Sequence, residues 1–222
     1  RRYVPSPVYV IDRFDRQRDS TGWQRQHAID ACQLLGLDRS FKYQQGSMEN
    51  LAAIAQACRS AAVARARLFG WLVFNVLVGN TDAHLKNLSF TVSHEGIQLA
   101  PFYDLLSVAA YETPAFDKST WPTETRLAWP IMGVDHFADI DRALLLKAGA
   151  GLNLGAATAL RILENLRSRI AKEAESLVAA VEAENARITD AQPDLAATLA
   201  GEMRCLRTIR HTIISPMAKQ IA

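Results

Sequence analysis

The chain has 222 residues, of which 49% are hydrophobic and 22% are charged, and its formal net charge is +2. This hydrophobic content is sufficient for a buried core, so the composition argues against a disordered chain. A near balance of charges, without clustered Lys and Arg, gives no argument for a protein that binds nucleic acid directly.

Neither a membrane span nor a metal-binding cysteine motif is recognisable. The longest apolar run, from Leu68 to Val78, is too short to cross a bilayer and is interrupted by Gly70 and Asn75. No secretory signal opens the chain. The cysteines are odd in number and far apart: Cys32, Cys58 and Cys205. We therefore expect a cytoplasmic protein with reduced core thiols and no membrane partner.

The first predicted element is a strand at residues 8–11, where Val, Tyr, Val and Ile follow one another. A strand needs neighbours to pair with, and few residues precede this one, so we expect the chain to be a fragment of a longer protein. The segment from Gln24 to Leu35 has apolar residues at helical spacing and stops at Gly36, which predicts a helix. Phe41 to Ser47 is predicted to be a loop.

Two further helices are predicted, at residues 48–58 and 62–78. The second is apolar on most faces in its later turns, which is typical of a central, buried helix. Two short strands follow, at 88–92 and 97–99, and the three residues His94, Glu95 and Gly96 between them predict a hairpin turn.

The remainder is predicted to be a loop with short extended pieces at 113–129 and then helix almost to the end. Apolar residues from Leu160 to Val181 repeat in threes and fours and predict an amphipathic stripe. Asp190 and Pro193 restart a final helix, which Pro216 is expected to break. The fold class predicted from these elements is mainly α with a small β-hairpin.

The polar run at residues 79–87 and the segment at 101–104 carry the chemistry. Phosphoryl transfer needs a carboxylate to orient the acceptor hydroxyl and two oxygen ligands to hold Mg²⁺ against the nucleotide phosphates. An Asp, an Asn five residues later and a second Asp beyond a hairpin supply these groups in that order: Asp82, Asn87 and Asp104. The hairpin is expected to fold Asp104 back beside Asn87.

Structural interpretations of the same residues compete with this one. Residues 79–82 also form a good helix exit and turn, and Asp104 is a possible helix cap. The joint order of the three residues favours the functional interpretation. His84 is expected to be structural, with its ring packed under the loop and hydrogen-bonded to the backbone, while for Lys86 phosphate and solvent are equally good expectations.

The segments at 74–87 and 100–107 resemble the catalytic and metal-binding segments of HipA-family kinases, the toxin halves of bacterial toxin–antitoxin pairs. The opening at 10–16 is similar to the hinge strand of that family, although Asp12 stands where Glu is usual. Short motifs at 41–43 and 127–129 also lie where the family has comparable ones. The resemblance spans nearly the whole chain and is strongest in the catalytic block.

This resemblance implies a protein-kinase-like C-lobe of HipA type. Residues 1–16 would be the hinge strand and the end of the N-lobe, and residues 17–222 the helical C-lobe, with the catalytic loop at 80–88 and the metal-binding segment at 100–107. The N-lobe would be absent apart from its hinge strand. The implied site residues are Asp82 as general base, Asn87 and Asp104 as Mg²⁺ ligands, Asp12 and Phe14 as backbone adenine contacts, Asp15 as a ribose contact, and Lys86 beside the nucleotide.

The implied activity is transfer of the γ-phosphoryl group of ATP to a Ser or Thr of a protein, as in a toxin that causes persistence. A working kinase also needs a Gly-rich loop over the phosphates and a Lys on the small lobe, yet the first lysine here is Lys42. We therefore expect this chain by itself to be inactive. The implied partners are a HipB-like antitoxin, operator DNA only through that antitoxin, and a protein substrate such as an aminoacyl-tRNA synthetase or another translation factor.

Two alternatives stay open at this stage. The Asp-x-His-x-x-Asn loop also occurs in aminoglycoside phosphotransferases and in lipid kinases of the phosphoinositide type, so a small-molecule or lipid kinase lobe is one alternative. The other is a non-catalytic module that docks an antitoxin through its helical half. The basic residues of the long helix are interleaved with Glu164, Glu173 and Glu175, which favours a solvated, ion-paired face over a phosphate-binding one.

Overall fold

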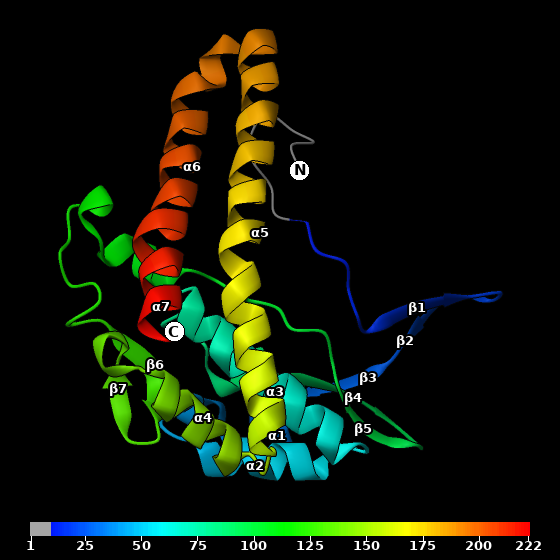
Figure 1. The fold of residues 1–222 in the computed structure, drawn as a ribbon. Helices are drawn as coiled ribbons and strands as arrows, with labels where there is room; N and C mark the ends of the chain where they lie inside the picture. Colours follow the sequence, from blue (N-terminus) through cyan, green and yellow to red (C-terminus); the bar gives the residue numbers. More distant parts are fainter. Residues whose placement is uncertain (1–9) are drawn as a thin grey trace.

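The computed structural model describes residues 10–222. Figure 1 shows a mostly helical body, a small sheet with a projecting hairpin on one side, and a long two-helix arm formed by α5 and α6. The strands are β1 (Arg16–Asp19), β2 (Gly22–Arg25), β3 (His27–Asp30), β4 (Ser89–Ser93), β5 (Gly96–Leu99), β6 (Arg126–Ile131) and β7 (Val134–His136). The α-helices are α1 (Ala31–Leu34), α2 (Met48–Ala57), α3 (Ala61–Leu77), α4 (Arg142–Gly151), α5 (Ala156–Ala191), α6 (Ala196–Thr208) and α7 (Ser215–Gln220).

The core is built around α3. Leu68, Phe69, Val73 and Leu77 of this helix have no exposed surface, and α2, α4 and α5 pack against it. The prediction of a central, buried helix at 62–78 is therefore confirmed, as is the helix predicted at 48–58. At Gly149 on α4, an added Cβ would lie 2.8 Å from the Cβ of Ala159, so glycine allows the close approach of α4 to α5.

The helix predicted from Gln24 to Leu35 is wrong in its first part. That part forms the end of β2 and all of β3, and only the short α1 is helical. β3 pairs antiparallel with β4 along its whole length, which turns the predicted two-stranded hairpin into a sheet of order β3-β4-β5. Pairing with a strand far away in the sequence thus overrides the local helical periodicity. Asp30 and Gln33 form a capping box at the start of α1.

The N-terminal strand prediction is only partly testable. Val8 and Tyr9 lie outside the described residues, while Val10 and Ile11 belong to no strand and are more than half exposed. The hairpin β1–β2 was not predicted, because its strands are almost wholly polar and exposed and carry no alternating pattern. The loop predicted at 113–129 gives way at Arg126 to β6, which pairs with β7.

The expected break at Pro216 does not occur. The chain runs from α6 through a π-helical turn (Ile209–Ile214) into α7 without interruption. Pro216 has no N–H to donate to the carbonyl of Thr212, one α-helical turn earlier. The indole N–H of Trp121 donates to that carbonyl at 3.0 Å, so a side chain from another segment satisfies the freed acceptor.

The amphipathic stripe on α5 is confirmed with a correction to its membership. The buried apolar residues are Ala159, Leu163, Ile170 and Val178, whereas Leu160 and Leu177, which were assigned to the stripe, are exposed. The polar face carries ion pairs, including Arg167 with Glu164 and Arg169 with Glu173, as predicted. Between residues 10 and 222 the structure contains no helix that is both long and apolar enough to cross a membrane.

The cysteines are free thiols. Cys32 and Cys58 are buried in the core, and Cys205 is half-buried. Burial raises the pKa of each thiol above its usual range, so the thiolate form is disfavoured. The prediction of core thiols is confirmed for the first two.

Candidate functional site

The predicted catalytic loop begins where α3 ends, at Gly79. This glycine has a φ of +65°, and an added Cβ would lie 2.8 Å from the Cβ of Ala109 and 2.9 Å from Cγ2 of Ile213. A residue with a side chain is therefore excluded both by its backbone conformation and by its neighbours. The glycine ends the buried helix and turns the chain into the predicted catalytic loop.

A buried pair of asparagines holds the two predicted site segments together. Asn80, 2% exposed, donates from its Nδ2 to Oδ1 of Asn75 at 2.8 Å and to the backbone carbonyl of Asp104 at 3.1 Å. Its Oδ1 accepts the backbone N–H of Asp82 at 3.0 Å. Asn75 in turn donates to the carbonyl of Trp71 within α3. One side chain thus connects the residue predicted as base to a residue predicted as metal ligand.

Asp82 lies at the surface end of this network. The hydroxyl of Tyr43 donates to its Oδ1, and Nε2 of His84 lies 3.9 Å from the same oxygen, beyond hydrogen-bond distance. The side chain of Asp82 is 42% exposed, so its carboxylate is accessible to a substrate. The position suits a carboxylate that must contact an external hydroxyl.

Asn87 and Asp104 lie in the segments that flank the β4–β5 hairpin in the sequence. Asn87 is buried, and its Nδ2 donates to the carbonyl of Asp82 at 3.1 Å, which leaves its amide oxygen as the group able to bind a cation. Asp104 is exposed and has a φ of +50°. The hydroxyl of Tyr103 donates to the carbonyl of Lys86 at 2.7 Å, which ties the segment around Asp104 to the one around Asn87.

His84 is a buried histidine of the predicted catalytic loop. Burial lowers its pKa below the ordinary value, and Lys42 lowers the pKa further, while Asp82 and Asp104 act electrostatically in the opposite direction. Nδ1 of His84 has no hydrogen-bond partner within residues 10–222, and the ring packs edge-on against Tyr43 at 5.1 Å between centroids. The ring is buried and packed as expected, but its Nδ1 does not make the expected hydrogen bond to the backbone.

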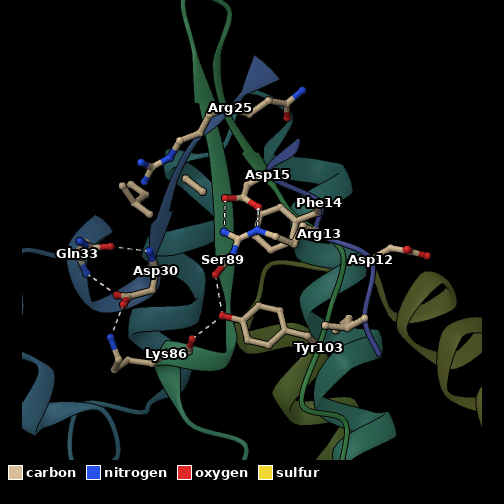
Figure 2. Close-up of a pocket in the computed structure, with 14 residues that line it drawn as sticks. Asp12, Arg13, Phe14, Asp15, Arg25, Asp30, Gln33, Lys86, Ser89 and Tyr103 are labelled. Carbon is tan, nitrogen blue, oxygen red and sulfur yellow. Dashed lines mark hydrogen bonds and ion pairs between the residues drawn. The ribbon is translucent and has the colours of Figure 1, made fainter. Parts of the chain in front are cut away.

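A cavity of about 520 Å³ adjoins the loop and gathers all four residues predicted to bind nucleotide: Asp12, Phe14, Asp15 and Lys86. Figure 2 shows Phe14, Asp15, Lys86 and Tyr103 around the pocket, whereas the carboxylate of Asp12 points away from them. The rings of Phe14 and Tyr103 are stacked, 6.3 Å apart at 14°. Segments distant in the sequence therefore meet in one open pocket, which has a flat aromatic element suited to a planar ligand.

The charged groups of this pocket are largely paired. Asp15 is 8% exposed and binds both Arg13 and Arg16, and the hydrogen bond from Arg13 holds the pKa of its carboxyl well below the usual range. Lys86 binds Asp30, which raises the pKa of the lysine. Lys86 thus contacts a carboxylate in the pocket wall, an arrangement that neither sequence expectation included.

The donor set is one of oxygens. Residues 10–222 contain no cluster of three or more His, Cys, Asp or Glu side chains arranged to hold a metal ion. An amide oxygen from Asn87 and a carboxylate from Asp104 are instead the kind of partial set that Mg²⁺ completes with water and substrate phosphates. The residues present therefore fit Mg²⁺ bound together with a nucleotide.

Tyr43 and Asn80 lie in segments that the sequence singled out, at 41–43 and 80–88, but no role was predicted for them, and Asp30 was not predicted to belong to the site. Asn75 gave a usable signal for the asparagine pair, because a polar residue in an otherwise apolar, buried helix requires a partner. Asp30 and Gln33 have the spacing of a capping box. Nothing in the sequence indicated that Tyr43 meets Asp82.

Comparisons with known proteins find sequences and a structure similar to this chain. The model of a family described as the HipA-like C-terminal domain matches residues 2–184. The serine/threonine-protein kinase toxin HipA of Shewanella oneidensis is 38% identical, over 46% of this chain and 27% of that protein. A solved complex of HipA, HipB and operator DNA from Shewanella oneidensis MR-1 has a chain with a TM-score of 0.65 and 25% identity.

The structural match covers 94% of this chain and 50% of the other. The chain thus spans half the length of the structural relative, and about a quarter of the curated relative is aligned. Properties of the whole relatives are therefore not transferred directly.

Proposed function

The chain belongs to the HipA-like C-terminal domain family, and from this we propose that it carries the catalytic loop of a Ser/Thr protein kinase that uses ATP. The observation that carries the proposal is the double contact of Asn80, which holds the backbone of Asp82 and that of Asp104 at once. A structural turn needs no such link to a segment beyond the hairpin. Phosphoryl transfer does, because base and metal ligand must be placed together.

Each residue has a defined role in this proposal. Asp82 accepts a hydrogen bond from the acceptor hydroxyl, orients it toward the γ-phosphorus and takes its proton. Asn87 and Asp104 hold Mg²⁺, which neutralises charge on the nucleotide phosphates when it is bound. Phe14 and Tyr103 line the pocket proposed for adenine, and the exposed Asp12 lies at its edge.

The proposed ribose contact of Asp15 needs an adjustment in its surroundings. Its carboxylate is bound by two arginines in the structure, so a ribose hydroxyl must share it with them. Lys86 likewise reaches a phosphate only by leaving Asp30. We propose that Asp15 and Lys86 order the pocket wall through their ion pairs. On binding, a nucleotide would contact these residues in addition to their present partners.

The binding partners that we propose for this chain are inferred from those of its structural relative. The structural relative is part of a complex with HipB and operator DNA, and we propose a HipB-like antitoxin as partner, with DNA contacted through it. The substrate is proposed to be a protein hydroxyl, for which a translation factor is one candidate, in the cytoplasm. The chain of 222 residues alone is proposed to be inactive, since no lysine precedes Lys42.

Calorimetric titration with Mg·ATP tests the nucleotide site. We expect binding that requires Mg²⁺ and is lost in Asp104→Ala. Asp117→Ala is a matched control, because Asp117 is also an exposed aspartate with positive φ, 60° against 50° for Asp104, and lies outside the site. Binding that survives Asp104→Ala would remove Asp104 as a ligand.

Phosphotransfer by the full-length natural protein tests the base. Asp82→Ala is expected to abolish labelling of protein by ATP while the unfolding midpoint stays near that of the unchanged protein. Full activity in this variant would exclude Asp82 as the base. If full-length protein binds no Mg·ATP at all, the chain acts as a docking module.

A further inference from the structure

The hydroxyl of Tyr43 donates a hydrogen bond to Oδ1 of Asp82. The two residues come from segments far apart in the sequence, and the backbone joins them as well, since the N–H of Leu85 donates to the carbonyl of Lys42 at 3.1 Å. The ring of Tyr43 is further held by His84, edge-on at 5.1 Å, and by the ammonium group of Lys42, 4.7 Å from its centroid. Tyr43 is therefore held in place against the loop at 80–88 by contacts of both its hydroxyl and its ring.

The hydrogen bond from Tyr43 to Asp82 is the same bond that an acceptor hydroxyl would have to make. In the proposed function, the acceptor of the phosphoryl group donates its proton in a hydrogen bond to Asp82. Tyr43 is the residue whose hydroxyl makes that bond in the described part of the chain. Tyr43 is 37% exposed and the side chain of Asp82 is 42% exposed, so a hydroxyl arriving from solvent can reach the carboxylate and displace the phenol.

Water is the competitor that such a site has to exclude. When a water molecule takes the acceptor position, it attacks the γ-phosphorus and the bond from that phosphorus to the β,γ-bridging oxygen breaks. The products are ADP and inorganic phosphate, and the proton passes to Asp82. An internal hydroxyl bound to Asp82 disfavours this reaction, because water has to replace a positioned donor.

We propose that Tyr43 is a specificity-determining residue that occupies the acceptor position on Asp82 until a protein hydroxyl displaces it, and thereby suppresses hydrolysis of ATP by water. This inference rests on the proposed function. A protein substrate gains from its own docking contacts the free energy that displaces the phenol, and water has no such source.

The test compares ATP hydrolysis by the full-length natural protein with that of its Tyr43→Phe variant, in the absence of protein substrate. We expect hydrolysis to rise about fivefold, the size of one net hydrogen bond removed, while phosphotransfer to protein persists. Tyr111→Phe is the matched control, because Tyr111 is an exposed tyrosine that packs against Phe116. Unchanged or slower hydrolysis in Tyr43→Phe would overturn the inference.

A second measurement addresses the hydrogen bond without activity. The bond to Asp82 raises the pKa of Tyr43 to about 12, so in full-length protein with ring-labelled tyrosine its NMR signal should remain that of the neutral phenol at about pH 11. In Asp82→Ala the signal should show ionisation at the same pH. Ionisation of Tyr43 already in the unchanged protein would contradict the contact.

Two outcomes separate the inference from the function on which it rests. If Asp82→Ala keeps full phosphotransfer, the proposed function fails whatever Tyr43 does. If Asp82→Ala is inactive and Tyr43→Phe hydrolyses ATP like the unchanged protein, the inference alone fails. Phosphate found on Tyr43 itself by mass spectrometry would also overturn it, because Tyr43 would then be an acceptor.

Discussion

Two buried asparagines show how differently two regions are stabilised. One region is the predicted catalytic block, at residues 74–87 and 100–107, and the other is the helical arm formed by α5 and α6. Asn80 is 2% exposed, and both ends of its amide are hydrogen-bonded, the Nδ2 end to Asn75 of α3 and to the carbonyl of Asp104. Asn185, in the part of α5 that forms the arm with α6, is 8% exposed, and its Nδ2 has no partner within residues 10–222. In Figure 1 the arm extends away from the part of the molecule that carries the β3-β4-β5 sheet.

The two regions are therefore stabilised by different kinds of interaction. The catalytic block depends on directional bonds that admit one arrangement, because a buried polar group without its partner costs free energy. The arm depends on an apolar stripe and on exposed ion pairs such as Arg207 with Glu182, which tolerate substitution. A change of one residue is therefore expected to matter most in the block.

The largest effect is expected for Gly79→Ala. Its positive φ and the two contacts below 3 Å that a Cβ would make should together lower the free energy of unfolding by about 3 kcal/mol. Gly133→Ala is the control, since its φ is +88° but nothing lies within 4 Å of an added Cβ. Urea unfolding of both variants measures the difference. If both variants lose the same free energy of unfolding, the surroundings of Gly79 accommodate a Cβ as easily as the exposed turn at Gly133 does.

Asn80→Ala comes next. Removal of its three hydrogen bonds should lower the free energy of unfolding by about 2–3 kcal/mol and weaken Mg·ATP binding, since the backbones of Asp82 and Asp104 lose their common support. Chemical denaturation and calorimetry measure the two effects. Normal binding by a folded Asn80→Ala protein would show that the link is structural only.

Asn185→Leu should act in the opposite direction. A leucine removes the unpaired amide from the interior of the arm, so the free energy of unfolding is expected to rise by about 1 kcal/mol. Thermal and urea unfolding detect the gain. A loss of stability would show that the amide of Asn185 makes a stabilising hydrogen bond, as the amide of Asn80 does.

The smallest effect concerns pH. Burial lowers the pKa of His84 in the folded protein, so the unfolded chain binds a proton more readily. Stability is then complete above the unfolded pKa of about 6.5 and falls as the pH drops through that value toward the folded pKa. Unfolding free energies at several pH values should show this slope, and His84→Gln should reduce it.

Much of the fold could be predicted from local patterns. The helices at 48–58 and 62–78 and the hairpin after residue 88 were correct because hydrophobic periodicity and glycine signals agree there. The strand β3 was not predicted, because its partner β4 lies far away in the sequence. The uninterrupted passage at Pro216 depends on Trp121, which no local pattern connects to the final helix.

The candidate site divides in the same way. The order of Asp82, Asn87 and Asp104, and the resemblance to HipA kinases that rests on it, could be read from the chain because the chemistry requires those residue types at that spacing. The sequence also indicated Asp12, Phe14, Asp15 and Lys86, which the structure brings into one pocket.

The sequence by itself determined the helical class, the buried helix before the loop and the family, since these follow from periodicity and from motifs continuous in the chain. Only the tertiary structure decided the pairing of Lys86 with Asp30, the bridging by Asn80 and the contact of Tyr43 with Asp82. Such contacts join segments whose separation in the sequence carries no periodic signal. They form because burial leaves each polar group only the partners that folding brings within reach.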